Sequence, residues 1–212
     1  MKRITIFFII MTSILIATVA TFVCAQITEP DAIATIKGTG PESTSIAGTV
    51  TFKQVGNDLT ISVSVQGVPP GKHGFHIHEK GDCSDNGKAA GGHFNPMGVT
   101  HGFLPTDGHE KAHSGDMGNI DIAEDGTGKL ELTLPYVHLS TVSGLAVILH
   151  EKVDDFGQPT GNAGGRIGCG IITPTHDMPE IMKTKAEPMK NDTMMMGQAE
   201  MGSMHEQMNA TK

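Results

Sequence analysis

Short segments in which apolar and polar residues alternate recur through the middle of the chain. The clearest is residues 59–65, where Leu59, Ile61, Val63 and Val65 are separated by Thr or Ser. Strict alternation is the pattern of a β-strand with one buried face. Further strand-like segments are residues 32–38, 45–54, 74–78, 119–123, 129–134, 145–149 and 167–173. Turn-forming residues separate them, which predicts an antiparallel sandwich or barrel.

Two long segments lack this alternation. Residues 79–116 are rich in Gly, Asp and His, and residues 151–166 form a second irregular stretch. Long loops in compact domains usually serve a function, and a bound metal can supply the order that regular structure does not. Residues 144–150, by contrast, are almost continuously apolar, which predicts a strand buried on both faces.

Composition narrows the fold class and the partners. Aromatic residues make up only 4% of the chain and Gly occurs 27 times, which favours an all-β fold with many turns over a helical bundle. The net charge is −8, so nucleic acid and anionic membranes are poor candidates as partners. An anionic substrate would need a local cation at its docking site.

The first 25 residues have the features of a signal peptide. Lys2 and Arg3 precede an apolar stretch that runs to Val23, and small residues occupy the positions before Gln26 that a signal peptidase reads. We predict cleavage after Ala25 and export to the periplasm or cell envelope. An uncleaved membrane anchor and lipidation of the adjacent cysteine are the alternatives. Cleavage would remove two of the 15 basic residues and none of the 23 acidic ones, which gives a net charge of −10.

Cleavage would also leave two of the three cysteines, Cys83 and Cys169. In an exported protein, two cysteines most simply form a disulfide. Two unpaired buried thiols are the alternative, which an oxidising compartment disfavours.

Residues 175–212 differ from the domain that we place at residues 26–174. They are polar, lack core periodicity and contain nine of the 13 methionines, so we interpret them as a disordered tail. Thioether sulfur prefers Cu(I). The tail, with His176 and His205, could therefore receive copper from a donor and deliver it to the domain. A solvated tail without metal is the alternative.

The histidines are the strongest indication of chemistry. His76 and His78 are two apart on an expected strand, so their rings share one face, and His150 ends another strand. Three or four neutral imidazoles suit copper or zinc. The long loop contains a second set, His93, His101, His113 and Asp116, and three imidazoles with one carboxylate suit a tetrahedral zinc ion. A single histidine would more simply be a surface or hydrogen-bonded side chain, but six histidines and one aspartate in these settings predict a two-metal site.

The same residues lie in five blocks that resemble the signature motifs of the copper–zinc superoxide dismutases. The blocks are Gly74-Phe75-His76-Ile77-His78-Glu79, Gly92-His93-Phe94-Asn95-Pro96, His113-Ser114-Gly115-Asp116-Met117-Gly118-Asn119, His150-Glu151-Lys152-Val153-Asp154-Asp155 and Gly161-Asn162-Ala163-Gly164-Gly165-Arg166-Ile167-Gly168-Cys169-Gly170. They occur in the family's order from about residue 32 to residue 172. The resemblance implies an eight-stranded Greek-key β-barrel with two long functional loops.

The resemblance also assigns the site residues. It implies one copper ion per subunit, bound by His76, His78, His93 and His150. It implies one zinc ion per subunit, bound by His93, His101, His113 and Asp116, with His93 bridging the two ions. Arg166 matches the arginine beside the copper, and Asp154 matches an aspartate that hydrogen-bonds one ligand of each metal. Cys83 and Cys169 match the family disulfide, and His73 matches a histidine that only braces loops.

The function implied is the conversion of superoxide to dioxygen and hydrogen peroxide by copper redox cycling, which would protect the cell envelope from superoxide. Arg166 would dock the anion and His93 would transfer a proton. A non-catalytic copper-binding or copper-buffering protein on the same scaffold is the alternative. Such a protein would be expected to lose a copper ligand, the arginine or the zinc set, and this sequence keeps all of them.

Three departures from the family pattern affect details. The spacing from His101 to His113 is long and contains His109, which is a rival for the zinc-ligand position; we favour His113 because Gly115 and Asp116 follow it in the expected pattern. The second loop is shorter than in animal members and lacks the charged residues that line their substrate channel. The placement of Cys83 resembles bacterial, exported members, and homodimer formation stays open because bacterial forms vary.

Overall fold

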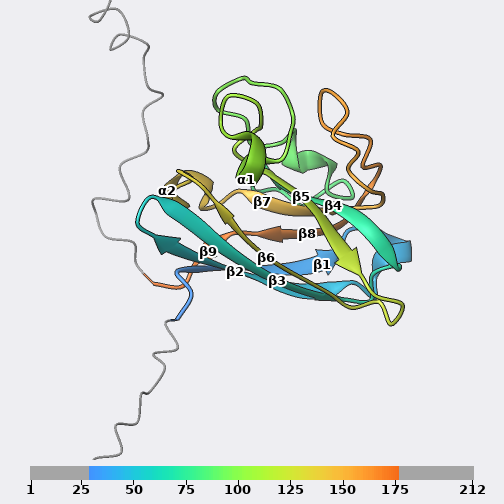
Figure 1. Cartoon of the computed structure of the whole chain (residues 1–212). Helices are drawn as coiled ribbons and strands as arrows, with labels where there is room; N and C mark the ends of the chain where they lie inside the picture. The colour runs from blue at the N-terminus through green and yellow to red at the C-terminus, as the bar shows by residue number, and fades with distance from the viewer. Residues whose placement is uncertain (1–28, 177–212) are drawn as a thin grey trace, which may run out of the picture.

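The computed structural model describes residues 29–176 and shows a closed antiparallel barrel (Figure 1). Its strands are β1 (Ala32–Gly38), β2 (Ala47–Val55), β3 (Asp58–Gln66), β4 (Gly71–His78), β5 (Asp116–Ile122), β6 (Gly128–Leu134), β7 (Ala146–His150), β8 (Arg166–Ile171) and the two-residue β9 (Thr173–Pro174). Short helical turns are η1 (Pro41–Ser43), η2 (Lys88–Ala90), α1 (Leu104–Asp107) and α2 (Leu139–Val142). The predicted signal peptide and residues 177–212 of the predicted tail lie outside the described residues.

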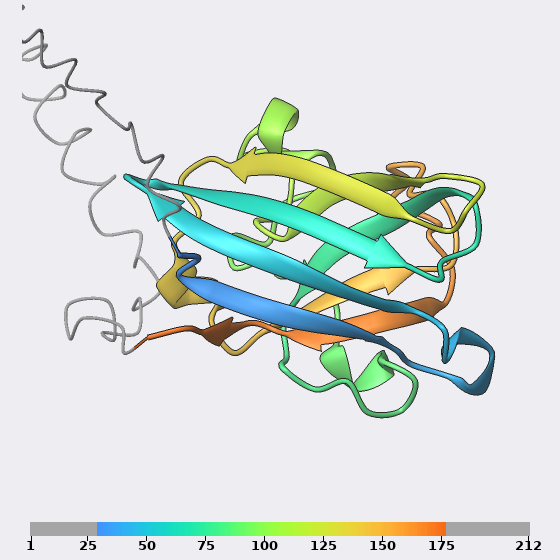
Figure 2. The ribbon, with the colours of Figure 1, turned by 90° about the horizontal axis from the view of Figure 1, so that it is seen from below.

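The strand order explains how the barrel closes. Neighbouring strands follow the order β2-β3-β6-β5-β4-β7-β8-β1, and β1 pairs again with β2. The chain passes over two strands between β3 and β4 and again between β6 and β7, which are Greek-key connections. Figure 2 shows β6, β3, β2 and β1 side by side on one wall of the barrel. The predicted all-β, eight-stranded fold is therefore confirmed.

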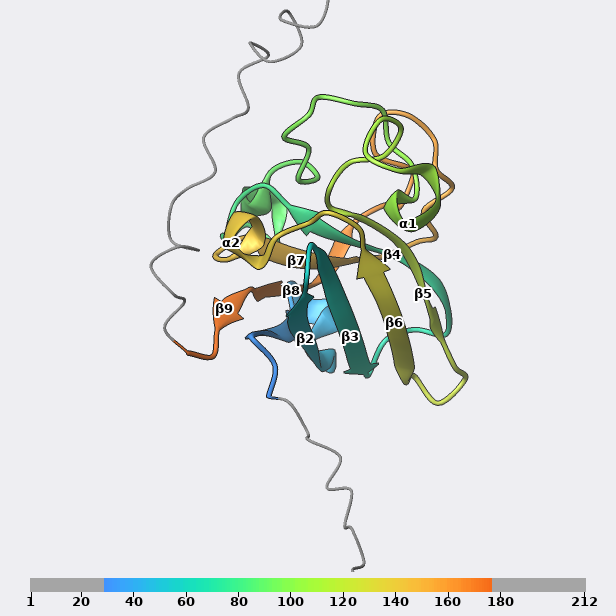
Figure 3. The ribbon, with the colours of Figure 1, turned by 60° about the vertical axis from the view of Figure 1, so that its left-hand side comes forward.

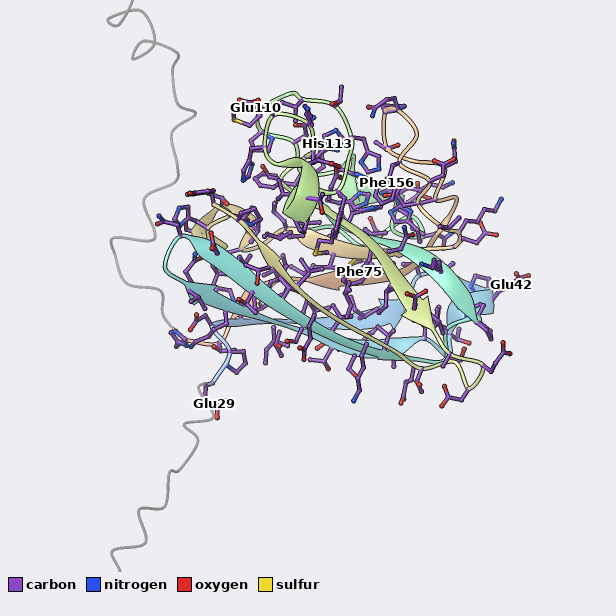
Figure 4. All side chains as sticks on the ribbon, in the orientation of Figure 1. Glu29, Glu42, Phe75, Glu110, His113 and Phe156 are labelled. Carbon is purple, nitrogen blue, oxygen red and sulfur yellow. A yellow bond between two sulfur atoms is a disulfide. The ribbon has the colours of Figure 1, made fainter. Side chains whose placement is uncertain are left out.

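The alternation of residue types places the core. In β3 the apolar residues are buried and the Ser and Thr residues between them are intermediate or exposed. All five residues of β7 are buried, as the continuous apolar run predicts. Phe75 on β4 is fully buried and lies inside the barrel (Figure 4). Burial of such side chains is the main force that closes the barrel.

The larger differences from the predicted strand boundaries are at three strands, and the other boundaries differ by two residues at most. β5 begins at Asp116 rather than Asn119, because Asp116 pairs with His76 of β4. β4 begins at Gly71 rather than Gly74, because Gly71 and Lys72 pair with Ile122 and Asp121 of β5. The last predicted strand is divided after Ile171: β8 pairs with β7 up to that residue, whereas β9 pairs only with β1. These differences arise from pairing with distant strands, which local composition does not reveal.

Both long loops lie on the same side of the barrel. The loop from β4 to β5 and the loop from β7 to β8 rise together above β4 and β7 (Figures 1 and 3). A disulfide joins Cys83 of the first loop to Cys169 of β8, as predicted. Within residues 29–176, no helix is long and apolar enough to cross a membrane. The fold thus brings the first loop, which carries His93, His101 and His113, and the second loop, which carries Asp154, over the strands that carry the other candidate ligands.

Candidate metal centre

Four buried histidines form one group under the loops. His76 and His78 project from the same face of β4, and His150 ends β7, the strand that pairs with β4. His93 comes from the first loop and forms an isolated bridge with His78. One donor nitrogen of each of the four residues lies within 4.8 Å of the others. This group is the one that the sequence predicts for copper.

The second group has three histidines around one carboxylate. Asp116 begins β5 directly opposite His76. Its Oδ1 lies 2.8 Å from His93 Nδ1, and its Oδ2 lies 2.8 Å from His101 Nδ1. The Nδ1 atom of His113 is 3.2 Å from Asp116 Oδ1. The structure therefore assembles the group that the sequence predicts for zinc.

His93 belongs to both groups. Its Nδ1 is turned to Asp116, while its ring centroid lies 4.1 Å from that of His76. An imidazole ring has two nitrogens and can serve a different partner with each. His109, by contrast, lies outside both groups, because its Nε2 is 2.7 Å from the carbonyl oxygen of Pro135. Of the two rivals, only His113 is in place to share a metal with Asp116.

Buried histidine nitrogens that lack a hydrogen bond indicate whether metal ions fit the two groups. The Nδ1 atoms of His76, His113 and His150 are buried and make no hydrogen bond of good geometry, although His113 Nδ1 lies 3.2 Å from Asp116 Oδ1. This is a costly condition for a polar atom. The Nε2 atoms of His78 and His150 are 3.3 Å apart. Metal coordination would satisfy these nitrogens. The donor sets also match: four imidazoles suit copper, and three imidazoles with a carboxylate suit zinc.

Asp154 connects the two groups. Its Oδ2 lies 2.9 Å from His76 Nε2, and both of its oxygens lie 3.0 Å from His101 Nε2. Its pKa is far below the usual range despite burial, because hydrogen bonds from His101 and His76 stabilise the anion. An ionised carboxylate only accepts hydrogen bonds, so both His76 and His101 carry a proton on Nε2. Nδ1 of His76, the unpartnered atom, is then free to bind a metal.

The protonation of His93 and His150 differs from that of His101. Burial lowers the pKa of His93 to about 4 and that of His150 to about 3. Both rings are therefore neutral near pH 7, as metal ligands must be. Burial also acts on His101, but hydrogen bonds to Asp116 and Asp154 outweigh it and raise the pKa of His101 to about 9. Without zinc, His101 is thus held as a cation between two carboxylates.

A small cavity of about 210 Å³ opens over the first group. Its lining residues are His78, Gly92, His93, His150, Thr160, Gly161, Ala163, Gly164 and Arg166. Arg166 begins β8 opposite His150 and donates hydrogen bonds to the carbonyl oxygens of Gly87 and Gly91. The Gly91 oxygen also lies 3.0 Å from His78 Nδ1. The same carbonyl thus orients a histidine and holds a permanent cation at the cavity wall.

The structure adds residues that sequence reasoning missed. Thr160 lines the cavity, and Gln158 hydrogen-bonds the backbone of His101. Neither has a side chain typical of a metal ligand, so neither was a candidate by residue type. His73 lies outside both groups, with its ring nitrogens each 2.9 Å from a carbonyl oxygen, that of Pro69 and that of His150. It therefore joins the β3–β4 turn to the end of β7.

Comparison with known proteins agrees with this arrangement. The family described as "Copper/zinc superoxide dismutase (SODC)" matches residues 46–172. The protein named "Extracellular superoxide dismutase [Cu-Zn]" from Brugia pahangi is 41% identical over 141 residues, which cover 60% of this chain and 69% of that protein. The solved structure titled "Crystal Structure Analysis of the clock protein EA4" is 39% identical, has a TM-score of 0.61, and matches over 69% of this chain and 96% of its own.

Proposed function

The chain belongs to the copper/zinc superoxide dismutase family, and from this premise we propose how it acts. Two superoxide anions and two protons are converted to dioxygen and hydrogen peroxide beside the four-histidine group. The copper ligands are His76, His78, His93 and His150. The zinc ligands are His93, His101, His113 and Asp116. The observation that carries the proposal is the pair of buried donor sets sharing His93, with Arg166 at the cavity beside them.

The two metal ions would supply redox chemistry and positive charge that the side chains of the site lack. Copper, when bound, provides the one-electron redox chemistry of both half-reactions, and zinc provides a charge without redox chemistry. One ion of each per subunit would satisfy the two donor sets.

Arg166 gives the substrate its docking charge. The protein has a net charge of −8, so the attraction of an anion must be local. Hydrogen bonds to two carbonyl oxygens hold the guanidinium beside the cavity, and its charge persists at any physiological pH. Local focusing of this kind raises association rates by about 10–10³-fold.

His93 is the residue that we assign to proton transfer. Its Nδ1 is turned to Asp116, so Nε2 is the nitrogen left for the four-histidine group and the cavity that the ring lines. A proton held at Nε2 can pass to the peroxide product. Asp116 keeps the ring oriented during the transfer.

The test is superoxide dismutation by the protein loaded with both metals, beside the variants His150→Ala and Arg166→Ala. Metal content is measured for each protein. We expect His150→Ala to lose copper and activity, and Arg166→Ala to keep both metals but react at least about tenfold more slowly. An inactive wild-type protein with both metals bound would refute the proposal.

Export and copper supply complete the proposed function. The relative from Brugia pahangi is named as extracellular, which supports export, and we propose that the protein protects the cell envelope. The nine methionines of residues 175–212 would gather copper for the four-histidine group. Deleting residues 177–212 should then reduce copper loading when copper is scarce. Unchanged loading would refute the role of the tail.

A further inference from the structure

One residue of the zinc set, His101, is held by three side chains of the second loop. Asp154, Phe156 and Gln158 occupy alternate positions between β7 and β8, and each contacts His101. The Asp154 carboxylate binds the ring nitrogen Nε2, as described above. The ring of Phe156 stacks on that of His101 with centroids 6.1 Å apart and an interplanar angle of 25°.

Gln158 makes the most specific of these contacts. Its side-chain Oε1 accepts a hydrogen bond of 2.9 Å from the backbone N–H of His101. Its Nε2 donates a hydrogen bond of 2.8 Å to the carbonyl oxygen of the same residue. The amide therefore pairs with His101 as a neighbouring strand would, and it satisfies both backbone groups of a residue that is only 4% exposed.

The segment that carries Gln158 is itself well ordered by hydrogen bonds. The exposed carboxylate of Asp155 accepts hydrogen bonds from the backbone N–H groups of Gly157 and Asn162. The N–H of Gly161 donates to the carbonyl oxygen of Gly157. The amide of Gln158 is thus presented on a preformed turn, which reduces the entropy lost when it pairs with His101.

We propose that Gln158 is a positioning residue for zinc. The inference rests on the proposed function, because it takes His101 as a zinc ligand. His101 lies in a segment without helix or strand, between Gly98 and α1, so its backbone is not fixed by a ladder of hydrogen bonds. The two hydrogen bonds between the Gln158 side chain and the His101 backbone, here called the Gln158 clasp, supply that restraint. They align Nδ1 of His101 with Asp116, 2.8 Å away.

Phe156 shields the same place from water. It is 43% exposed, and its ring stacks on that of His101 and lies at a tilt to that of Phe103, with centroids 6.4 Å apart. Figure 4 labels Phe156 on the second loop and His113 on the first, both on the same side of the barrel. A residue that covers a ligand ring slows the entry of water and of competing ligands. Gln158 and Phe156 together therefore favour retention of zinc rather than the chemistry at copper.

The clasp also connects the zinc side to the substrate cavity. Thr160 and Gly161 follow Gln158 closely in the same turn and line the cavity over the four-histidine group. The hydrogen bonds between Gln158 and the backbone of His101 anchor this turn to the first loop. We therefore expect loss of these hydrogen bonds in Gln158→Leu to loosen the cavity wall as well.

The test compares Gln158→Leu with Gln66→Leu in the protein loaded with both metals. Leucine approximates the size of glutamine but makes no hydrogen bonds, and Gln66 is an exposed glutamine at the end of β3, far along the chain from the site. Zinc release to a chromogenic chelator is followed in time. We expect Gln158→Leu to release zinc about tenfold faster than wild type, because loss of residues that support metal ligands typically lowers metal affinity by about 10–100-fold. We expect Gln66→Leu to match wild type.

A second measurement separates positioning from a general loss of stability. Amide hydrogen exchange at His101, measured by NMR, should accelerate in Gln158→Leu, because its N–H loses its partner. The absorption spectrum of cobalt placed in the zinc site should change in Gln158→Leu and not in Gln66→Leu. Zinc release at the wild-type rate in Gln158→Leu, or equal acceleration in both variants, would overturn the inference.

Failure of the proposed function would look different. If the wild-type protein holds no zinc, the zinc assignment is wrong and the positioning role falls with it. If zinc binds and the protein is active, but exchange at His101 is unchanged in Gln158→Leu, only the positioning role is wrong.

Discussion

The disulfide between Cys83 and Cys169 should contribute a large part of the stability of the metal-free protein. The two cysteines are 86 residues apart in the sequence. Closing a loop of that length in the unfolded chain removes entropy worth about 4.6 kcal/mol at 25 °C in the chain-entropy treatment. Whole domains are stable by only about 5–15 kcal/mol. Replacing both cysteines by serine should therefore lower the free energy of unfolding by about 2–5 kcal/mol.

Urea unfolding of the metal-free protein measures this loss. For a slope of about 2 kcal/mol per molar urea, a loss of 4 kcal/mol moves the midpoint down by about 2 M. The double variant Cys83→Ser, Cys169→Ser should be compared with wild-type protein whose disulfide has been reduced. The two should agree closely if the covalent link, and not the packing of Cys169 against Ala90 and Ile148, is the source of the stability.

The disulfide should also affect the candidate active site. The loop that it anchors contains Gly87 and Gly91, whose carbonyl oxygens hold Arg166. We expect the double variant with both metals bound to lose activity at low superoxide concentration. A change in the free energy of unfolding below about 1 kcal/mol would refute the reasoning on stability, and unchanged activity would refute the link to Arg166.

Three other changes test separate parts of the structure. Arg166→Lys keeps the charge but loses the two-pronged hydrogen bonding, so activity should fall by less than in Arg166→Ala, as measured from the rate constant at several salt concentrations. Phe75→Ala should cost about 3–5 kcal/mol in urea unfolding, because it leaves a cavity in the barrel, whereas Val55→Ala at an exposed position should cost about 0.5 kcal/mol or less. The pKa of His101 is raised to about 9 in the folded, metal-free protein. Protonated His101 therefore stabilises that protein. The whole of this stabilisation is present below the unfolded pKa of about 6.5, and it is lost as the pH rises through 9. The melting temperature should therefore fall over that interval in wild type and less in His101→Gln; equal falls would contradict this assignment.

The strands could be predicted from the sequence because their signal is local. Alternation in residues 59–65 places Leu59, Ile61 and Val63 on one face regardless of which strand lies beside them. The continuous apolar run of β7 likewise indicates burial on both faces. Boundaries at β4 and β8 were less accurate, because the first and last pairs of a strand depend on its partner.

Residue type and motif were enough to identify the candidates for metal binding, since His76, His78, His93 and the others are recognisable in the sequence. How these residues are joined depends on the tertiary structure. In the folded chain, the ring of His109 binds the carbonyl oxygen of Pro135, whereas His113 lies beside Asp116. The fold also brings Gln158 to His101, 57 residues away in the sequence. Hydrogen bonds across such separations depend on how the two loops pack over the barrel, and no local pattern of residues encodes that packing.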